Sequence, residues 1–306
     1  MKEKVVNNPL IACLLFAAQF FTHTVFAAQT TDTFVLPQDS RVPGGVAVIA
    51  LIDKKANQKA SLENKQENKQ KYKQKTNSDV RFNGQRVWQL IDAQQNHWAI
   101  IGIPLSQKVG PVPYTVNGKT QYFSIVDKAY KEQRLTVKRK HSNPPADQIE
   151  RIQRESRLSK QAFTTFSNGE DNHSFQGFLK PAQGPTSSPF GLKRFFNDQP
   201  RRPHSGLDIA GPRGSNIIAP ADGTIILTGK FFFNGNSIFI DHGQGLITMY
   251  CHMDVLERNL GEVVKAGDII GTIGATGRVT GPHLHWTVSL NNSRVDPLLF
   301  LKSDEQ

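Results

Sequence analysis

Side chains able to bind a metal gather in three short stretches toward the C-terminal end of the sequence. The stretches are His204-Ser205-Gly206-Leu207-Asp208, Tyr250-Cys251-His252 and Pro282-His283-Leu284-His285-Trp286. Imidazole nitrogens and carboxylate oxygens both bind zinc, at about 2.0–2.2 Å. Two histidines and one carboxylate, with a fourth position left for water, make the open arrangement of a catalytic zinc site. These residue types therefore indicate metal-assisted hydrolysis, although the spacing of His204 and Asp208 is common by itself.

His283 and His285 lie two residues apart in a segment that has the pattern of a strand. Side chains alternate between the two faces of a strand, so both imidazoles point one way while Leu284 and Trp286 point the other. One histidine can then bind a metal while its neighbour reaches a water or a substrate. A pair of surface or hydrogen-bonded histidines has the same spacing, so the residues alone leave both interpretations open.

The same alternation applies to residues 246–253, which also have a strand pattern. It predicts that Thr248, Tyr250 and His252 share one face and that Cys251 lies on the other. If His252 faces a site, Cys251 faces the core. We therefore expect Cys251 to be a small buried apolar residue, and neither a ligand nor a nucleophile.

Short strands joined by turns must position these side chains. Apolar runs with Gly or Pro at almost every join predict a compact, mostly antiparallel β domain over residues 177–306, with little helix. Asn234-Gly235 predicts a hairpin between strands at 223–233 and 236–241. His242 falls at the next turn, which it is expected to stabilise.

A second β region precedes this one, over residues 28–137. The run 46–52 is apolar and rich in β-branched residues, as expected of a buried strand. Asn83-Gly84 and Asn117-Gly118 are turn signals between further candidate strands. Several short strands with regular turns predict a small β-sandwich.

An insertion interrupts this first β region at residues 53–79. It is rich in Lys, Gln and Asn and nearly free of large apolar side chains, so burial cannot offset its ordering entropy. The composition favours a solvated loop. A basic tether to an anionic surface, such as lipopolysaccharide or wall glycan, is the alternative interpretation.

A helical linker, residues 138–176, is predicted between the two β regions. Pro145 and Asp147 are typical of a helix start, and Ile149, Ile152 and Leu158 follow at helical spacing.

Residues 1–27 have the pattern of a secretory signal peptide. They contain a lysine-bearing start, an apolar run over 10–21 and small residues before a cleavage point after Ala27. The predicted mature chain lies in the periplasm, has no spanning segment and carries one cysteine, Cys251. An uncleaved membrane anchor is the alternative, although the apolar run is short for one.

The charge of the chain is unevenly distributed. The net charge of the 306 residues is +11, and +10 of it lies in residues 28–180, whereas residues 181–306 are neutral overall. We therefore do not expect nucleic acid as a partner of the whole chain. An apolar content of 38% excludes disorder throughout, and two cysteines exclude a disulfide scaffold.

The C-terminal motifs, in this order, resemble the lysostaphin-type (LytM-type) zinc metallopeptidases that cut peptidoglycan cross-bridges. The matching segments are Ser187-Ser188-Pro189-Phe190-Gly191, His204 to Asp208, Ala219-Pro220-Ala221-Asp222-Gly223, Tyr250-Cys251-His252, Gly274-Ala275-Thr276-Gly277 and Gly281-Pro282-His283-Leu284-His285. The segment Ser40-Arg41-Val42-Pro43-Gly44-Gly45 is similar to the small β domain that precedes the peptidase in some Gram-negative members.

The resemblance implies a mainly β fold in which one Zn2+ per chain lies on the floor of an open groove. It assigns His204, Asp208 and His285 to the metal, and His252 and His283 to a catalytic pair beside it. The implied substrate is peptidoglycan, at stem-peptide cross-links between D-Ala and diaminopimelate. Relatives that only activate other wall hydrolases carry a degenerate set, whereas the set is complete here. A zinc amidase acting on the same wall is a further alternative.

Overall fold

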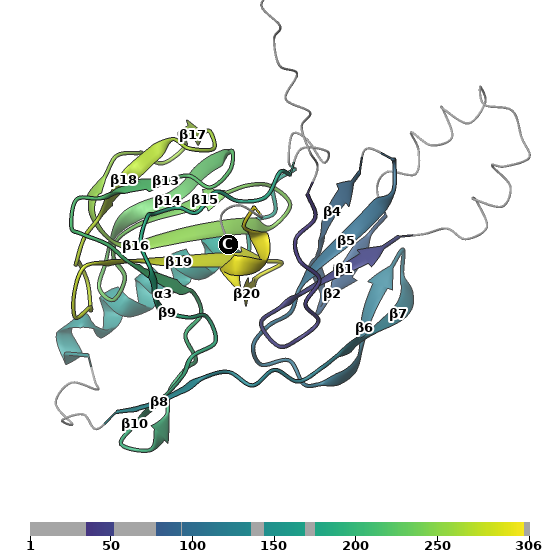
Figure 1. Ribbon diagram of the computed structural model, residues 1–306, viewed down its shortest axis with the longest axis horizontal. Coiled ribbons are helices and arrows are strands. Elements are labelled where there is room, and N and C mark those ends of the chain that lie inside the picture. The colour runs from purple at the N-terminus through teal and green to yellow at the C-terminus, as the bar shows by residue number, and fades with distance from the viewer. Residues whose placement is uncertain (1–34, 52–77, 93, 136–143, 169–174, 303–306) are drawn as a thin grey trace, which may run out of the picture. The chain divides into compact units, whose positions relative to one another are not determined.

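The computed structural model describes residues 35–51, 78–92, 94–135, 144–168 and 175–302 (Figure 1). The expected signal peptide and nearly all of the lysine-rich insertion lie outside these ranges. The described part is mainly β, and α3 (Ile149–Phe163) is its single α-helix, accompanied by the short 3-10 helices η2 (Ala146–Gln148) and η3 (Pro297–Phe300). No helix within it has the length and apolar character needed to cross a membrane.

The C-terminal region forms a large sheet of ten strands, whose described pairs are all antiparallel (Figure 1). Seven strands form its main path, in the order β17-β14-β15-β16-β19-β12-β9, while β13 and β18 pair with each other, β18 also pairs with β16, and β20 pairs with β19. The strands are β9 (Thr186–Ser188), β12 (Leu207–Ala210), β13 (Asn216–Ile218), β14 (Gly223–Phe231), β15 (Gly235–Asp241), β16 (Leu246–Leu256), β17 (Val263–Val264), β18 (Ile269–Ile273), β19 (His283–Leu290) and β20 (Ser293–Val295). The antiparallel β domain predicted from apolar runs and turns is confirmed.

The N-terminal region consists of two small antiparallel sheets. One has the order β1-β5-β4 and the other β3-β2-β6-β7. Their inward-facing side chains, among them Ala47, Phe82, Ile101 and Phe123, form one buried apolar cluster, so the sheets pack face to face as predicted for a sandwich. The strands are β1 (Val46–Ala50), β2 (Val80–Phe82), β3 (Gln85–Arg86), β4 (Trp88–Ile91), β5 (His97–Gly102), β6 (Gly110–Val116) and β7 (Lys119–Ile125).

The sheet β1-β5-β4 is buried on both of its faces. Its second face carries Val46, Trp88 and Ile100, which belong to the same core cluster as Trp286 and Leu290 of the large sheet. A strand that is covered on both faces needs a continuous apolar run, and this explains the unbroken apolar pattern of β1. The two β regions therefore share a hydrophobic core within the unit Thr33–Gln306.

Buried hydrogen bonds accompany this shared core. Asn291 Oδ1 accepts from the Gly102 N–H at 2.7 Å, and Asn291 Nδ2 donates to the Gly102 carbonyl at 3.0 Å. A Cβ on Gly102 would come within 2.6 Å of the Leu290 carbonyl oxygen, so glycine is required where the two backbones approach. These contacts satisfy backbone groups that burial would otherwise leave unpaired.

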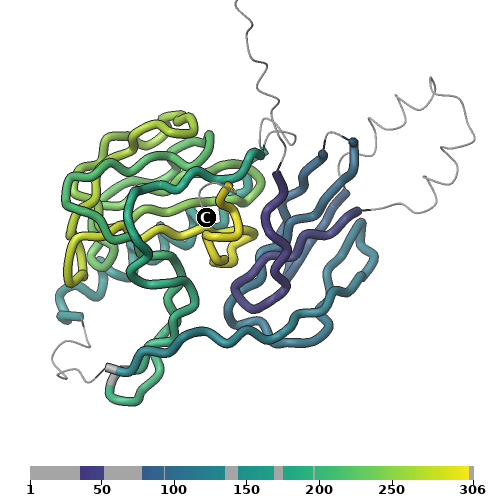
Figure 2. Tube along the Cα trace, in the orientation of Figure 1, coloured from purple at the N-terminus to yellow at the C-terminus, as the bar shows by residue number. Residues whose placement is uncertain are grey.

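A third, three-stranded sheet joins segments that are far apart in the sequence. β8 (Glu132–Leu135) pairs in parallel with β10 (Lys193–Phe196), which pairs with β11 (Gln199–Pro200). Figure 2 shows these segments side by side in the trace. Tyr130, just before β8, packs over Gly191, where a Cβ would lie 2.1 Å from the tyrosine ring. The stretch that leads to His204 is therefore held from outside the large sheet.

Helix α3 lies within the predicted linker and packs on the large sheet. Phe163 at its end is buried, with its ring centroid 5.3 Å from that of Phe239 on β15. Two residues of the predicted helical pattern, Ile149 and Leu158, are instead 45% and 41% exposed. The helix is therefore fixed mainly by its C-terminal turn and by Glu155, whose Oε2 accepts from the Phe232 N–H at 2.7 Å.

Candidate metal centre

Two neighbouring strands bring three of the predicted residues together. In the antiparallel register of β12 and β19, Asp208 lies opposite His285 and Ala210 lies opposite His283. Directly opposed side chains share a face of the sheet. Leu284 and Trp286 on the other face of β19 are fully buried in the core. The predicted alternation along residues 283–286 is confirmed.

His204 reaches the same place from the segment that precedes β12. Its backbone is bonded in both directions, because its N–H donates to the Leu192 carbonyl at 3.0 Å and its carbonyl accepts from Gly191 N–H at 2.8 Å. Gly206 follows beneath the His285 ring, where a Cβ would lie 2.7 Å from Nε2. The glycine therefore lets the chain pass close under the ring and turn into β12.

The potential ligand atoms of the three side chains face a single point. Asp208 Oδ1 lies 3.0 Å from His204 Nε2 and 2.8 Å from His285 Nδ1, and the two nitrogens are 3.1 Å apart. A tetrahedral zinc ion with bonds of about 2.0–2.1 Å separates its ligand atoms by about 3.3 Å. The three atoms therefore stand close to three corners of such a tetrahedron.

Hydrogen bonds behind the rings select the nitrogen that each ligand histidine presents. His204 Nδ1 donates to the Pro189 carbonyl at 2.9 Å, and His285 Nε2 lies 3.0 Å from the Thr287 hydroxyl. The opposite nitrogens are thereby turned toward Asp208. This is the outer layer of partners that orients histidine ligands in metal sites, so the residues fit a zinc ion.

The ionisation of the cluster suits a cation. Burial raises the pKa of Asp208, but hydrogen bonds from His204 and His285 outweigh it and hold this pKa far below its usual range. Burial lowers the pKa of His285, more than the nearby carboxylate of Asp208 raises it. At neutral pH the centre therefore offers an ionised carboxylate and a neutral His285 imidazole, which are the forms that bind metals.

His252 and His283 lie next to these three residues. Their ring centroids are 4.9 Å apart, and His283 Nε2 is 4.0 Å from Asp208 Oδ1. His252 Nδ1 donates to the Thr276 carbonyl and His283 Nδ1 to the Gly281 carbonyl, each at 2.9 Å. Both rings therefore keep Nε2 available. Burial, above all, lowers the pKa of His252 to about 4, so this ring is neutral at pH 7.

The predicted alternation is wrong at His252. Tyr250 lies opposite Trp286 and faces the core, so regular pleating would turn His252 to the core as well. Instead, His252 has a φ of +62° and sits in a bulge, where the pairing of β15 with β16 shifts register. A bulge re-aims a side chain, and here it sends the imidazole to the other face of the sheet, toward His283.

Cys251 is a buried apolar residue, as predicted. It is fully buried and belongs to the cluster of Phe163, Phe239 and Met249 beneath α3. Burial raises the pKa of its thiol to about 12, so it stays protonated and is neither a ligand nor a nucleophile.

Some residues of the centre were not found from the sequence. The carbonyls of Pro189, Thr276 and Gly281 carry no side-chain signal. Thr287 does have one, because it lies two residues after His285 on the same strand face. Arg194, whose Nη2 is 4.0 Å from Asp208 Oδ2, comes from the separate sheet formed with β8, and its position depends on that pairing.

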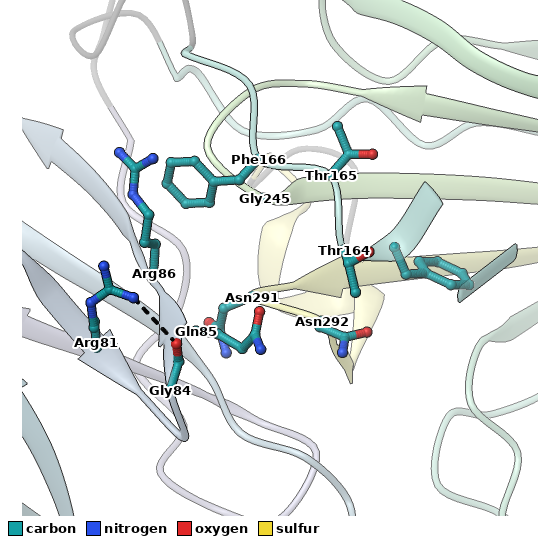
Figure 3. A pocket seen from close by; sticks show the side chains of 11 residues that line it. Arg81, Gly84, Gln85, Arg86, Thr164, Thr165, Phe166, Gly245, Asn291 and Asn292 are labelled. Carbon is teal, nitrogen blue, oxygen red and sulfur yellow. Dashed lines mark hydrogen bonds between the residues drawn. The ribbon is translucent and has the colours of Figure 1, made fainter. Parts of the chain in front are cut away.

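A pocket of about 200 Å³ lies elsewhere and contains none of the five residues (Figure 3). Several of its polar side chains have partners within the protein. Arg81 pairs with Asp79 at 2.9 Å, Arg86 stacks on the Phe166 ring at 4.0 Å, and Asn292 Oδ1 accepts from Arg294. Among the described residues, the group that could hold a metal ion is that of His204, Asp208 and His285.

Comparisons with known proteins agree with this geometry. The model of the family described as peptidase family M23 matches residues 202–297. A solved structure titled putative peptidase M23 from Pseudomonas aeruginosa is 37% identical, covers 86% of this chain and 96% of its own, and superposes with a TM-score of 0.67.

Two curated relatives match the C-terminal region. DD-carboxypeptidase/endopeptidase Mpg of Neisseria meningitidis is 39% identical over 112 residues, which are 37% of this chain and 26% of the relative. Peptidoglycan DD-endopeptidase ShyB of Vibrio cholerae is 41% identical over 96 residues, or 31% of this chain and 22% of the relative. The chain spans about a quarter of the length of these curated relatives.

Proposed function

Because the chain belongs to peptidase family M23, we propose that it is a zinc-dependent endopeptidase that hydrolyses stem-peptide cross-links in peptidoglycan. The proposed bond joins D-Ala to diaminopimelate, in keeping with the DD-endopeptidase names of the relatives. Family membership confirms the resemblance drawn from the motifs. The substrate, the bond and the residue roles are our proposal.

One observation carries the proposal: the ligand atoms of His204, Asp208 and His285 converge beside two further histidines with open nitrogens. We assign these three residues to one zinc ion per chain. We assign His252 and His283 to the catalytic pair. A module that only activated another wall hydrolase would need neither the ligand set nor the bulge that aims His252, so that alternative is not favoured.

Zinc, when bound, polarises the scissile carbonyl and acidifies a water molecule at the site. The protein supplies the proton transfers. His252 and His283 each donate Nδ1–H to a carbonyl, so each leaves Nε2 as the ring nitrogen that can accept a proton from the attacking water. The imidazolium that forms can stabilise the developing oxyanion and then give its proton to the leaving amine.

The proposed location is the periplasm, reached through the signal peptide at residues 1–27. A substrate in the cell wall requires an extracytoplasmic enzyme, and the curated relatives come from Gram-negative bacteria. The mature chain, residues 28–306, is then the active species. Residues 177–306 alone would expose the part of their core that Val46, Trp88 and Ile100 cover.

Muropeptide analysis tests the proposal. Residues 28–306, loaded with one zinc ion, are incubated with Gram-negative sacculi, and the soluble fragments are identified by mass. We expect cross-linked dimers to become monomers. Release of whole stem peptides from the glycan would show an amidase, and trimming of a terminal D-Ala alone would show a carboxypeptidase. Unchanged sacculi with zinc bound would contradict hydrolysis.

A further inference from the structure

Arg194 approaches the proposed metal centre from outside the large sheet. It lies on β10, which is held on one side by β8 and on the other by β11. Its Nη2 donates to Ser188 Oγ at 2.9 Å and lies 4.0 Å from Asp208 Oδ2. Ser188 and Asp208 are cross-strand partners in β9 and β12, so the guanidinium lies over a single pair of opposed residues.

The two oxygens of Asp208 have different surroundings. Oδ1 faces His204 Nε2 and His285 Nδ1 at 3.0 and 2.8 Å. Oδ2 faces the guanidinium of Arg194. A planar guanidinium that is always charged holds a carboxylate oxygen in place more firmly than a flexible ammonium does. One carboxylate oxygen of Asp208 therefore faces the ligand nitrogens, and the other faces the guanidinium of Arg194.

A second contact extends from the same guanidinium toward His204. Ser188 Oγ, which accepts from Arg194, is also 3.4 Å from His204 Nδ1. Ser188 is buried, with an exposed fraction of 8%. Arg194 therefore lies beside one proposed ligand, Asp208, and donates to Ser188, which lies beside another, His204.

The position of Arg194 leaves one of its buried donors unpaired. Its Nε atom is buried and has no hydrogen-bond partner among the described residues. Buried donors are almost always paired, so an unpaired one requires an explanation. The same guanidinium places its Nη2 against Ser188 and near Asp208, so the side chain leaves one buried donor unpaired while it lies beside the centre.

We propose that Arg194 is a positioning residue of the metal centre, which holds Asp208 so that Oδ1 alone is presented to the metal. The proposal rests on the proposed function, since it assumes that the three residues bind zinc. Partners of this kind behind metal ligands typically change metal affinity by about 10–100-fold when they are removed. Arg194 lies in the second layer, so its loss weakens the site without removing any ligand.

Zinc affinity of the purified chain tests the proposal directly. Arg194→Gln, Arg194→Lys and Ser188→Ala are titrated with zinc against a chromophoric chelator, and the cobalt(II) absorption spectrum reports the coordination number. We expect Arg194→Gln to bind zinc about 10–100-fold more weakly than wild type. Arg194→Lys restores part of the affinity because it keeps a charge, and Ser188→Ala falls between the lysine variant and wild type.

Lys193→Gln is the matched control, because this neighbouring β10 residue has an exposed side chain and loses the same charge. Its zinc affinity is expected to stay within about twofold of wild type. The metal-free forms of all variants should have the same thermal unfolding temperature as metal-free wild type. If Arg194→Gln fails to fold, Arg194→Lys and Ser188→Ala decide.

Two results would overturn the positioning role. One is wild-type zinc affinity with an unchanged cobalt spectrum in Arg194→Gln. The other is the same affinity with a raised KM, which would make Arg194 a substrate contact. If wild type itself binds no zinc, the proposed metal centre fails first, and that result is distinct from either outcome.

Discussion

His242 and His252 lie close together in the sequence, but their ring nitrogens have different surroundings. His242 precedes β16 and His252 lies within it, and burial lowers the pKa of each to about 4. His242 Nδ1 donates to the Asp222 carbonyl at 2.7 Å, and its Nε2 accepts from the Thr248 hydroxyl at 2.8 Å. His252 uses only Nδ1, and no described residue hydrogen-bonds to its Nε2.

This difference separates a structural histidine from a candidate catalytic one. A perturbed pKa is shared by both and therefore does not identify the function of either. An open ring nitrogen, a left-handed backbone and a second imidazole at 4.9 Å are found at His252 and not at His242. Strained backbone that the fold nevertheless maintains is typical of functional sites.

The largest effect is expected from His285, a third histidine whose pKa burial lowers. Its Nδ1 faces the other ligand atoms, so His285→Ala removes one of three protein ligands. We expect bound zinc and muropeptide cleavage to be lost together. Metal analysis of the purified variant, beside wild type treated with a chelator and then reloaded, measures both. A variant that kept one zinc per chain would refute the ligand assignment.

His252→Ala is expected to have the next largest effect. Loss of a proton-transfer group typically costs about 10²–10⁴-fold in rate, while the ligand set stays intact. Cleavage of cross-linked dimers should fall by this factor with one zinc still bound. His242→Gln serves as the control and should cleave like wild type. Equal turnover in His252→Ala and wild type would contradict a catalytic role for His252 and leave it a structural histidine like His242.

The strands around these histidines could be predicted because their signals are local. Alternation in β19 follows from a period of two, and the hairpin after β14 follows from Asn234-Gly235. The bulge at His252 could not be predicted, since no glycine marks the positive φ. The placement of Arg194 was hidden for another reason: it depends on β8, whose residues lie about 60 positions earlier and pair only in the folded chain.

The low pKa of His242 should make the free energy of unfolding fall as the pH falls. Its pKa is about 4 in the folded protein and 6.5 as the ordinary value, so the unfolded chain takes up the proton first as the pH falls. The contribution of neutral His242 to the free energy of unfolding is fully present above pH 6.5. It falls by about 3 kcal/mol in total as the pH is lowered from 6.5 to 4.

His242→Gln keeps a donor and an acceptor but has no titrating nitrogen. Urea unfolding of metal-free protein at several pH values compares it with wild type. The free energy of unfolding of wild type should fall by about 3 kcal/mol more than that of the variant across this window. Parallel pH profiles would mean that His242 is not held neutral by the fold.

Tyr250→Phe is expected to have the smallest effect, and it tests the corrected face of β16. The sequence pattern places Tyr250 beside His252, in which case its hydroxyl would lie in the site. In the structure Tyr250 is buried in the core, and its hydroxyl donates to Thr248 Oγ1 at 2.9 Å, which in turn donates to His242. Removing the hydroxyl loses one hydrogen bond, worth about 1 kcal/mol.

Thermal unfolding of Tyr250→Phe should record that small loss, with zinc content and dimer cleavage unchanged. A drop in cleavage without a loss of stability would instead put Tyr250 on the face of His252, and the bulge would then have no part in aiming the imidazole.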